Sequence, residues 1–173
     1  GGLVVNQQLI VGPNAITGEW GHNPLPGYEP AQDGPTQPCY CGRHNCIERF
    51  ISGTGFAGRF VERHHRSLSP RGIIMAAGQG DPQAQAHYDH FIQALARSVA
   101  SLINVLDPDV IVVGGGLSNI DSLYLDLPQA LTPYLFSDRC ITPIVPARHG
   151  DSSGVRGAAW LPSCAEGVAT WAI

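Results

Sequence analysis

Apolar residues recur every three or four positions between residues 82 and 106, and this spacing predicts a long amphipathic helix. The main repeat consists of Phe91, Leu95, Val99, Leu102 and Leu106. Further apolar residues widen the stripe, so we expect the helix to be buried on most of its sides. Asp81 is a suitable N-cap, Pro82 suits the first helical position, and the pair Asp107-Pro108 ends the pattern.

The second half of the chain continues with alternating strand and helix patterns. The run Asp109-Val110-Ile111-Val112-Val113 is apolar after its first residue, which predicts a central strand covered on both faces. Three glycines then turn the chain. We expect a helix kinked by Pro128 over residues 122–136, a strand over residues 141–147, and a further helix from about Ser152. The order helix, strand, helix, strand, helix predicts an α/β fold.

The first half of the chain predicts shorter elements. Val4-Val5 and residues 9–11 flank the polar residues 6–8, as in a β-hairpin. Residues 47–63 follow a helical pattern with a glycine-rich break at residues 53–55, and residues 69–80 predict a short connecting helix. At the other end, residues 162–173 show no apolar period. We therefore expect one domain over residues 1–161 and a poorly ordered tail.

Length, charge and hydropathy narrow the classes of function. A chain of 173 residues suits a single domain with a substantial core. The net charge of −4 and only ten lysines and arginines argue against a nucleic-acid partner, which requires a concentrated positive field. No stretch approaches the roughly 20 apolar residues needed to cross a bilayer, so we expect no membrane partner and a cytoplasmic location.

A group of cysteines follows a loop rich in proline and glycine. Residues 17–38 contain five prolines, a density that excludes long regular elements. The cysteines, in the pattern C-x-C-x4-C, are Cys39, Cys41 and Cys46. One histidine would complete a Cys3His zinc site, and His22 is favoured because the loop can return it to the cysteines, with His44 as the competing ligand. The alternative is three surface thiols in a reducing compartment.

Two carboxylates lie beside the predicted metal loop, Glu19 before it and Glu48 after it. A carboxylate can accept hydrogen bonds from two neighbouring sugar hydroxyls, and a metal-bound His22 still offers its second ring nitrogen. Glu19, His22 and Glu48 could therefore form a polyol clamp. Alternatively, the carboxylates are solvated or paired with Arg43 or Arg49.

Three consecutive glycines, Gly114, Gly115 and Gly116, follow the predicted buried strand. Bare backbone allows a ligand to approach closely, and a helix opening near Ser118 would present amides that favour an anion. The alternative is a tight turn between a strand and a helix.

These motifs resemble those of the ROK group of bacterial sugar kinases and sugar-responsive repressors, most closely its fructokinase-type members. The similarity covers about residues 1–161. The matching segments are residues 18–26 (GEWGHNPLP), 38–42 (PCYCG) with 46–48 (CIE), 51–57 (ISGTGFA), 104–112 (NVLDPDVIV) with the three glycines, and 149–159 (HGDSSGVRGAA).

The resemblance implies the C-terminal domain of an actin-like (ribonuclease H-like) sugar kinase fold, with an inserted zinc-binding loop over about residues 17–50. The implied sugar contacts are Glu19, His22 and Glu48. The implied ligands of a structural Zn2+ are His22, Cys39, Cys41 and Cys46. The glycines 114–116 would line the nucleotide side, where ATP binds with Mg2+. The implied activity is ATP-dependent phosphorylation of a hexose, with fructose as first choice, and we also expect a homo-oligomer.

The chain departs from the family pattern in two ways. Sixteen residues separate His22 from Cys39, a spacing shared by the fructokinase-type members but longer than in the glucokinase-like ones. The family's D-x-G-G-T phosphate loop and catalytic aspartate are absent. We therefore expect that the N-terminal domain is missing and that the chain alone keeps zinc, binds sugar weakly and transfers no phosphate. The competing hypotheses are the effector domain of a sugar-sensing repressor and a purely structural zinc module.

Overall fold

The computed structural model describes the backbone of residues 1–165 and the side chains of residues 1–160. The elements in chain order are β1 (Val4–Val5), β2 (Gln8–Leu9), η1 (Trp20–His22), α1 (Pro30–Asp33), α2 (Glu48–Ile51), α3 (Gly53–His64), α4 (Pro70–Gly78), α5 (Pro82–Leu106), β3 (Ile111–Val113), η2 (Gly116–Asn119), α6 (Asp121–Leu131), η3 (Thr132–Tyr134), β4 (Ile144–Pro146), η4 (Gly150–Ser152) and α7 (Ser153–Ala165).

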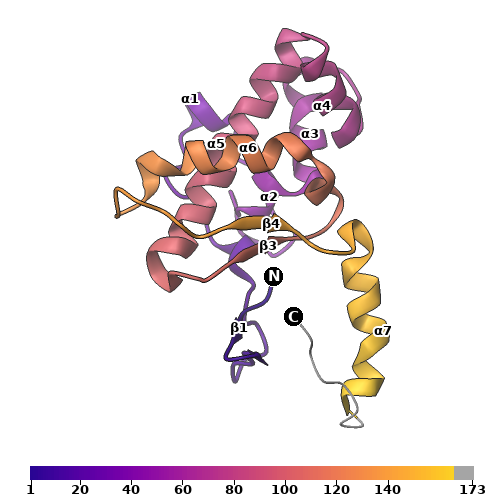
Figure 1. Cartoon of the computed structure of the whole chain (residues 1–173). Coiled ribbons are helices and arrows are strands. Elements are labelled where there is room, and N and C mark those ends of the chain that lie inside the picture. The colour runs from indigo at the N-terminus through magenta and orange to yellow at the C-terminus, as the bar shows by residue number, and fades with distance from the viewer. Residues whose placement is uncertain (166–173) are drawn as a thin grey trace.

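Helix α5 lies at the centre of the fold and packs against α4 and α6 (Figure 1). Its predicted bounds are confirmed: the Asp81 carboxylate accepts hydrogen bonds from the backbone amides of Gln83 and Ala84, and Asp107 ends the helix in the left-handed conformation. The buried face of α5 joins α3, α4 and α6 in one core, where each large apolar side chain contributes roughly 1.5–3 kcal/mol. The largest fully buried members are Phe56, Phe60, Ile73, Leu123, Leu127 and Leu131.

Strands β3 and β4 pair in parallel, with Ile111 opposite Ile144, and lie against the helical layer (Figure 1). The prediction that β3 is covered on both faces is wrong, because Val112 is 58% exposed. Side chains alternate along a strand, so Ile111 packs against the core while Val112 points away from it. The predicted hairpin is confirmed as β1 and β2, which pair antiparallel around a turn with positive φ at Asn6 and Gln7.

The helical pattern of residues 47–63 is interrupted one residue before the predicted glycine-rich break. Helix α2 ends at Ile51, and Ser52 adopts an extended conformation, from which its hydroxyl caps α3 by accepting a hydrogen bond from the Gly55 amide. The glycines lie in the first turn of α3. A Cβ at Gly55 would lie 2.4 Å from the carbonyl oxygen of Arg49, so this glycine permits a close contact between two helices rather than a break.

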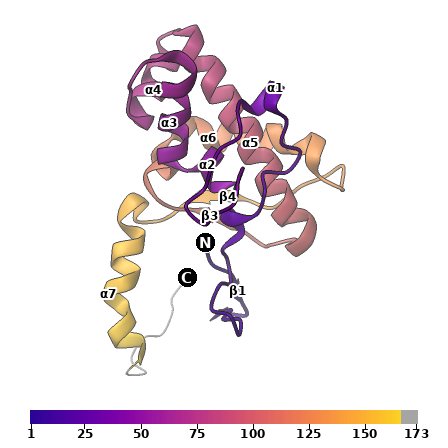
Figure 2. The same ribbon diagram turned by 180° about the vertical axis from the view of Figure 1, so that it is seen from behind.

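A buried ion pair anchors the proline-rich loop to the helical layer. Arg97 of α5 donates to both carboxylate oxygens of Asp33 in α1, at 2.5 and 3.2 Å, and also to the backbone carbonyls of Pro26 and Gly27. Figure 2 shows α1 beside α5, where this contact is made. One arginine side chain therefore holds the loop at several points.

Helix α7 extends away from the helical layer in both views (Figures 1 and 2). Its Val155 and Trp160 are 75% and 55% exposed. Residues 162–165, predicted to begin a tail, continue this helix, and residues 166–173 lie outside the described part of the chain. Among the described helices, none is both long and apolar enough to span a bilayer.

Candidate functional site

Four predicted metal ligands come together in the structure, with their ligand atoms all within 4.8 Å of one another. The four are His22, Cys39, Cys41 and Cys46. The Nδ1 atom of His22 lies 3.6 Å from Cys39 Sγ, and Cys41 Sγ lies 3.6 Å from Cys46 Sγ. A tetrahedral zinc ion separates its nitrogen and sulfur ligands by roughly 3.5–3.8 Å. The donor set and these two distances fit such an ion. Other ligand atoms are up to 4.8 Å apart, which is wider than in a zinc-bound site.

Backbone hydrogen bonds place the ligands. His22 is the last residue of the short helix η1. Two residues later, Pro24 forms an antiparallel bridge with Cys46, which brings His22 close to the third cysteine. The Cys39 amide donates to the Arg43 carbonyl across a tight turn, in which Gly42 has a φ of 85° that favours glycine. The loop is thus folded into a defined structure despite its many prolines.

The competing histidine, His44, is exposed and does not belong to the ligand cluster. His44 forms instead an isolated antiparallel bridge with Pro38. Of the cysteines whose side chains are described, Cys140 is exposed and is not part of the cluster. The structure therefore brings together the ligand set with His22.

The thiols differ in their acidity. The pKa of Cys41 is lowered to about 7, mainly by a hydrogen bond from the backbone amide of Arg43. Burial instead raises the pKa of Cys46 to about 12. A coordinated thiol is a thiolate, so a zinc ion held by these residues would supply the positive charge that offsets the burial of Cys46.

The second nitrogen of His22 faces the two predicted sugar-binding carboxylates. His22 Nε2 lies 3.9 Å from Glu19 Oε2 and 3.9 Å from Glu48 Oε2. Among the described residues, neither carboxylate forms an ion pair with an arginine, so the predicted alternative of Arg43 or Arg49 partners is not observed. The Glu19 and Glu48 side chains are 54% and 37% exposed. This arrangement offers hydrogen-bond acceptors around one imidazole at the surface.

Tyr40 is a neighbour of this group that the sequence analysis did not single out. Its hydroxyl lies 3.0 Å from His22 Nε2, and its ring meets the imidazole edge-on, with centroids 5.1 Å apart. A signal was available in the sequence, because Tyr40 stands between the predicted ligands Cys39 and Cys41.

The three glycines form an exposed turn after β3. Gly115 has a φ of 76°, and a Cβ at any of the three would meet open space. The expected helix start near Ser118 is wrong: Ser118 lies inside the short helix η2, is 2% exposed, and donates its hydroxyl to the Gly115 carbonyl. The α-helix begins only at Asp121, so its amides are not at the glycine turn.

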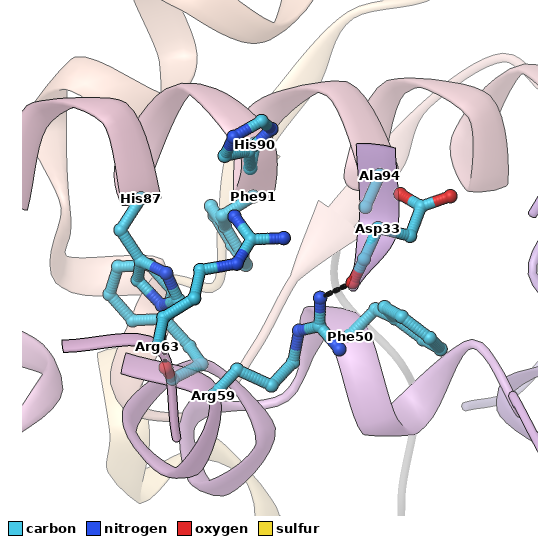
Figure 3. A pocket seen from close by; sticks show the side chains of 9 residues that line it. Asp33, Phe50, Arg59, Arg63, His87, His90, Phe91 and Ala94 are labelled. Carbon is cyan, nitrogen blue, oxygen red and sulfur yellow. Dashed lines mark hydrogen bonds between the residues drawn. The ribbon is translucent and has the colours of Figure 1, made fainter. Parts of the chain in front are cut away.

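A cavity of about 10 Å3 lies elsewhere, among side chains of α1, α2, α3 and α5 (Figure 3). Two polar atoms there, His87 Nδ1 and Arg59 Nη1, are buried without a partner among the described protein atoms. His87 Nε2 bonds to the Phe56 carbonyl at 2.8 Å, so Nε2 is the donor and Nδ1 an acceptor. Burial lowers the pKa of Arg59 to about 10. The size and the donor–acceptor pair suit one buried water molecule rather than a substrate.

Most of the chain is similar to known proteins of one family. A profile of the ROK family matches residues 1–164. An N-acetyl-D-glucosamine kinase of Yersinia pseudotuberculosis (strain YPIII) is 43% identical over 164 residues, and one of Shigella boydii (strain Sb227) is 41% identical. Each match covers 93% of this chain and 54% of the relative. The chain thus spans about half the length of these curated relatives.

Solved structures share the fold. The ROK hexokinase of Thermus thermophilus matches with a TM-score of 0.75 and 28% identity, over 91% of this chain and 51% of that one. A ROK glucokinase of Streptomyces griseus, in complex with glucose and AMPPNP, matches with a TM-score of 0.76 and 24% identity, over 92% of this chain and 55% of that one. The predicted α/β fold of the actin-like sugar kinases is confirmed, and this chain belongs to the ROK family.

Proposed function

We propose that the protein carrying this chain is an ATP-dependent hexose kinase whose sugar site includes Glu19, His22 and Glu48. The observation that carries the proposal is the position of His22, with one ring nitrogen at the cysteine cluster and the other 3.9 Å from each carboxylate. Family membership and the relatives that are sugar kinases support the same reaction.

Each group has a distinct role in this proposal. The carboxylates of Glu19 and Glu48 accept hydrogen bonds from sugar hydroxyls, and His22 Nε2 donates one. His22, Cys39, Cys41 and Cys46 would hold Zn2+, which fixes the loop and the tautomer of the imidazole. Hexose orientation, rather than proton removal, is the task of these residues.

The phosphate side of the reaction depends on other groups. Glycines 114–116 would line the nucleotide side, where Mg2+ and ATP bind, because their exposed backbone allows close approach. The base that accepts the proton of the attacking hydroxyl is expected on a domain outside residues 1–173. This chain alone should therefore transfer no phosphate.

The identity of the hexose is a separate question. The names of the curated relatives favour N-acetyl-D-glucosamine, whereas the sequence resemblance to fructokinase-type members favours fructose. We place N-acetyl-D-glucosamine first because those relatives match over 93% of the chain. Steady-state assays of the full protein with N-acetyl-D-glucosamine, fructose and glucose rank them by kcat/KM.

Replacement of one clamp carboxylate tests the sugar site. Glu48→Gln should raise the KM for the hexose at least about tenfold, because a charged acceptor of sugar hydroxyls is lost. The bound zinc should stay unchanged. Glu29→Gln, at an exposed position of the same loop, is the matched control. Equal KM values for the two variants would remove Glu48 from the sugar site.

A sugar-responsive repressor is the second candidate. The fold is shared with a ROK family transcriptional regulator, a homologue of the E. coli MLC protein, with a TM-score of 0.65 and 22% identity. In such a protein the same site would bind sugar without turnover. ATP-dependent formation of a sugar phosphate by the full protein would decide for the kinase, and sugar binding without turnover would decide for the repressor.

A further inference from the structure

The hydroxyl of Tyr40 takes a position that the proposed function requires for the sugar. It lies 3.0 Å from His22 Nε2, the nitrogen that faces Glu19 and Glu48. Tyr40 is 81% exposed, so hydrogen bonding at its hydroxyl rather than burial of its ring holds it there. The contact therefore joins an exposed surface side chain to a partly buried histidine.

The geometry of His22 leaves one ring nitrogen, Nε2, for both Tyr40 and a sugar. The Nδ1 atom points to Cys39 at 3.6 Å, within the ligand cluster, so its lone pair is directed at the metal position. The tautomer that presents this lone pair to the metal position carries its proton on Nε2. A hydrogen bond of this kind is directional, and a single N–H has one good acceptor at a time. A sugar hydroxyl and the Tyr40 hydroxyl therefore compete for the same N–H.

We propose that the Tyr40 hydroxyl occupies the sugar-hydroxyl position at His22 while the site is empty, and that the sugar must displace it, so that Tyr40 sets the affinity for the hexose. This inference rests on the proposed function, because it assumes that His22 binds sugar. Displacement needs only a rotation of an exposed side chain, whose hydroxyl water can then solvate. Tyr40 thereby lowers the apparent affinity without blocking the site.

Tyr40→Phe tests the inference, because it removes the hydroxyl and keeps the ring. The dissociation constant of the full, zinc-loaded protein for the hexose, measured by calorimetry, should fall roughly 2- to 10-fold, the range of one net hydrogen bond. In turnover, KM should fall while kcat stays unchanged. Tyr134→Phe is the matched control, because it loses a hydrogen bond that a tyrosine hydroxyl donates to Gln93, on other elements of the fold.

The outcomes separate this inference from the proposed function. If Glu48→Gln weakens sugar binding but Tyr40→Phe leaves it unchanged, the sugar site stands and the Tyr40 inference is overturned. Weaker binding in Tyr40→Phe would make Tyr40 a direct sugar contact, which also overturns the inference. Tyr40→Ala, with zinc content and melting temperature measured in parallel, must show the same tightening. If Glu48→Gln also leaves sugar binding unchanged, the proposed sugar site itself fails.

Discussion

Asp33 and Arg97, 64 positions apart in the chain, form a two-point ion pair whose side chains are only about 5–6% exposed. Arg97 lies on the central helix and Asp33 on the proline-rich loop, so the pair joins the least regular part of the chain to the most regular. The cysteine cluster lies at the end of that loop. The orientation of the candidate site therefore depends on a contact remote from it.

Removal of one partner of this pair should destabilise the fold strongly. Asp33→Asn leaves the Arg97 charge buried without its counter-ion, and we expect the free energy of unfolding to fall by about 3–5 kcal/mol. Urea denaturation of the zinc-loaded protein measures the change. Asp89→Asn, an exposed position on α5, should change stability by less than about 0.5 kcal/mol. Similar values for both variants would show that the ion pair is dispensable.

Zinc content should depend on the clustered cysteines and not on Cys140. We expect about one zinc ion per chain in the purified protein, and its loss in Cys46→Ser, because a hydroxyl is a poor substitute for a thiolate at a site of this type. Elemental analysis provides the measurement. Cys140→Ser changes an exposed cysteine outside the cluster and should retain the metal. A wild-type protein without zinc would contradict the assignment.

Two glycines of α3 should respond in opposite directions to the same substitution. In Gly55→Ala the new Cβ meets the Arg49 carbonyl oxygen at 2.4 Å, so α2 and α3 must separate and stability should fall by about 1–3 kcal/mol. In Gly58→Ala the Cβ meets open space, and stability should rise by about 0.5–1 kcal/mol because alanine favours the helix. Melting temperatures that shift in the same direction would contradict this difference.

Stability should fall in mild acid because of His87. This side chain is 3% exposed, and burial lowers its pKa from 6.5 to about 4. Between pH 6.5 and pH 4, His87 is protonated in the unfolded state but not in the folded state. The free energy of unfolding therefore decreases as the pH falls through this range and is constant below pH 4. The loss amounts to at most about 3 kcal/mol.

The variant His87→Gln identifies the source of this pH dependence. Glutamine can still donate to the Phe56 carbonyl but does not titrate, so the stability of the variant should depend less on pH between 6.5 and 4. His149→Gln, at an exposed position, should keep the wild-type profile. Denaturation curves at several pH values compare the three proteins, and identical profiles would exclude His87.

Local features of this chain were predictable from the sequence. The bounds of α5 follow from Asp81, Pro82 and the helical spacing, all of which act within a few residues. The ligand cluster was predicted because three of its members lie within eight positions, so that one turn brings them together.

Features that depend on the packing of distant segments were not predictable in the same way. The exposure of Val112 depends on what covers β3, and an apolar run carries no information on its neighbours. The close contact of Gly55 with Arg49 resembles a helix break in sequence, because glycine serves both purposes. The pairing of Asp33 with Arg97 has no local signal, since neither residue reveals its partner 64 positions away.

The outward face of β3 has a consequence for handling the protein. Val112 in β3 is 58% exposed, and Val110, just before the strand, is 46% exposed. Within the described residues, β3 pairs only with β4. An uncovered strand edge with apolar neighbours is a template for adding another strand. Solutions of this chain by itself should therefore aggregate more readily as concentration rises, and a charged residue in place of Val112 should delay precipitation.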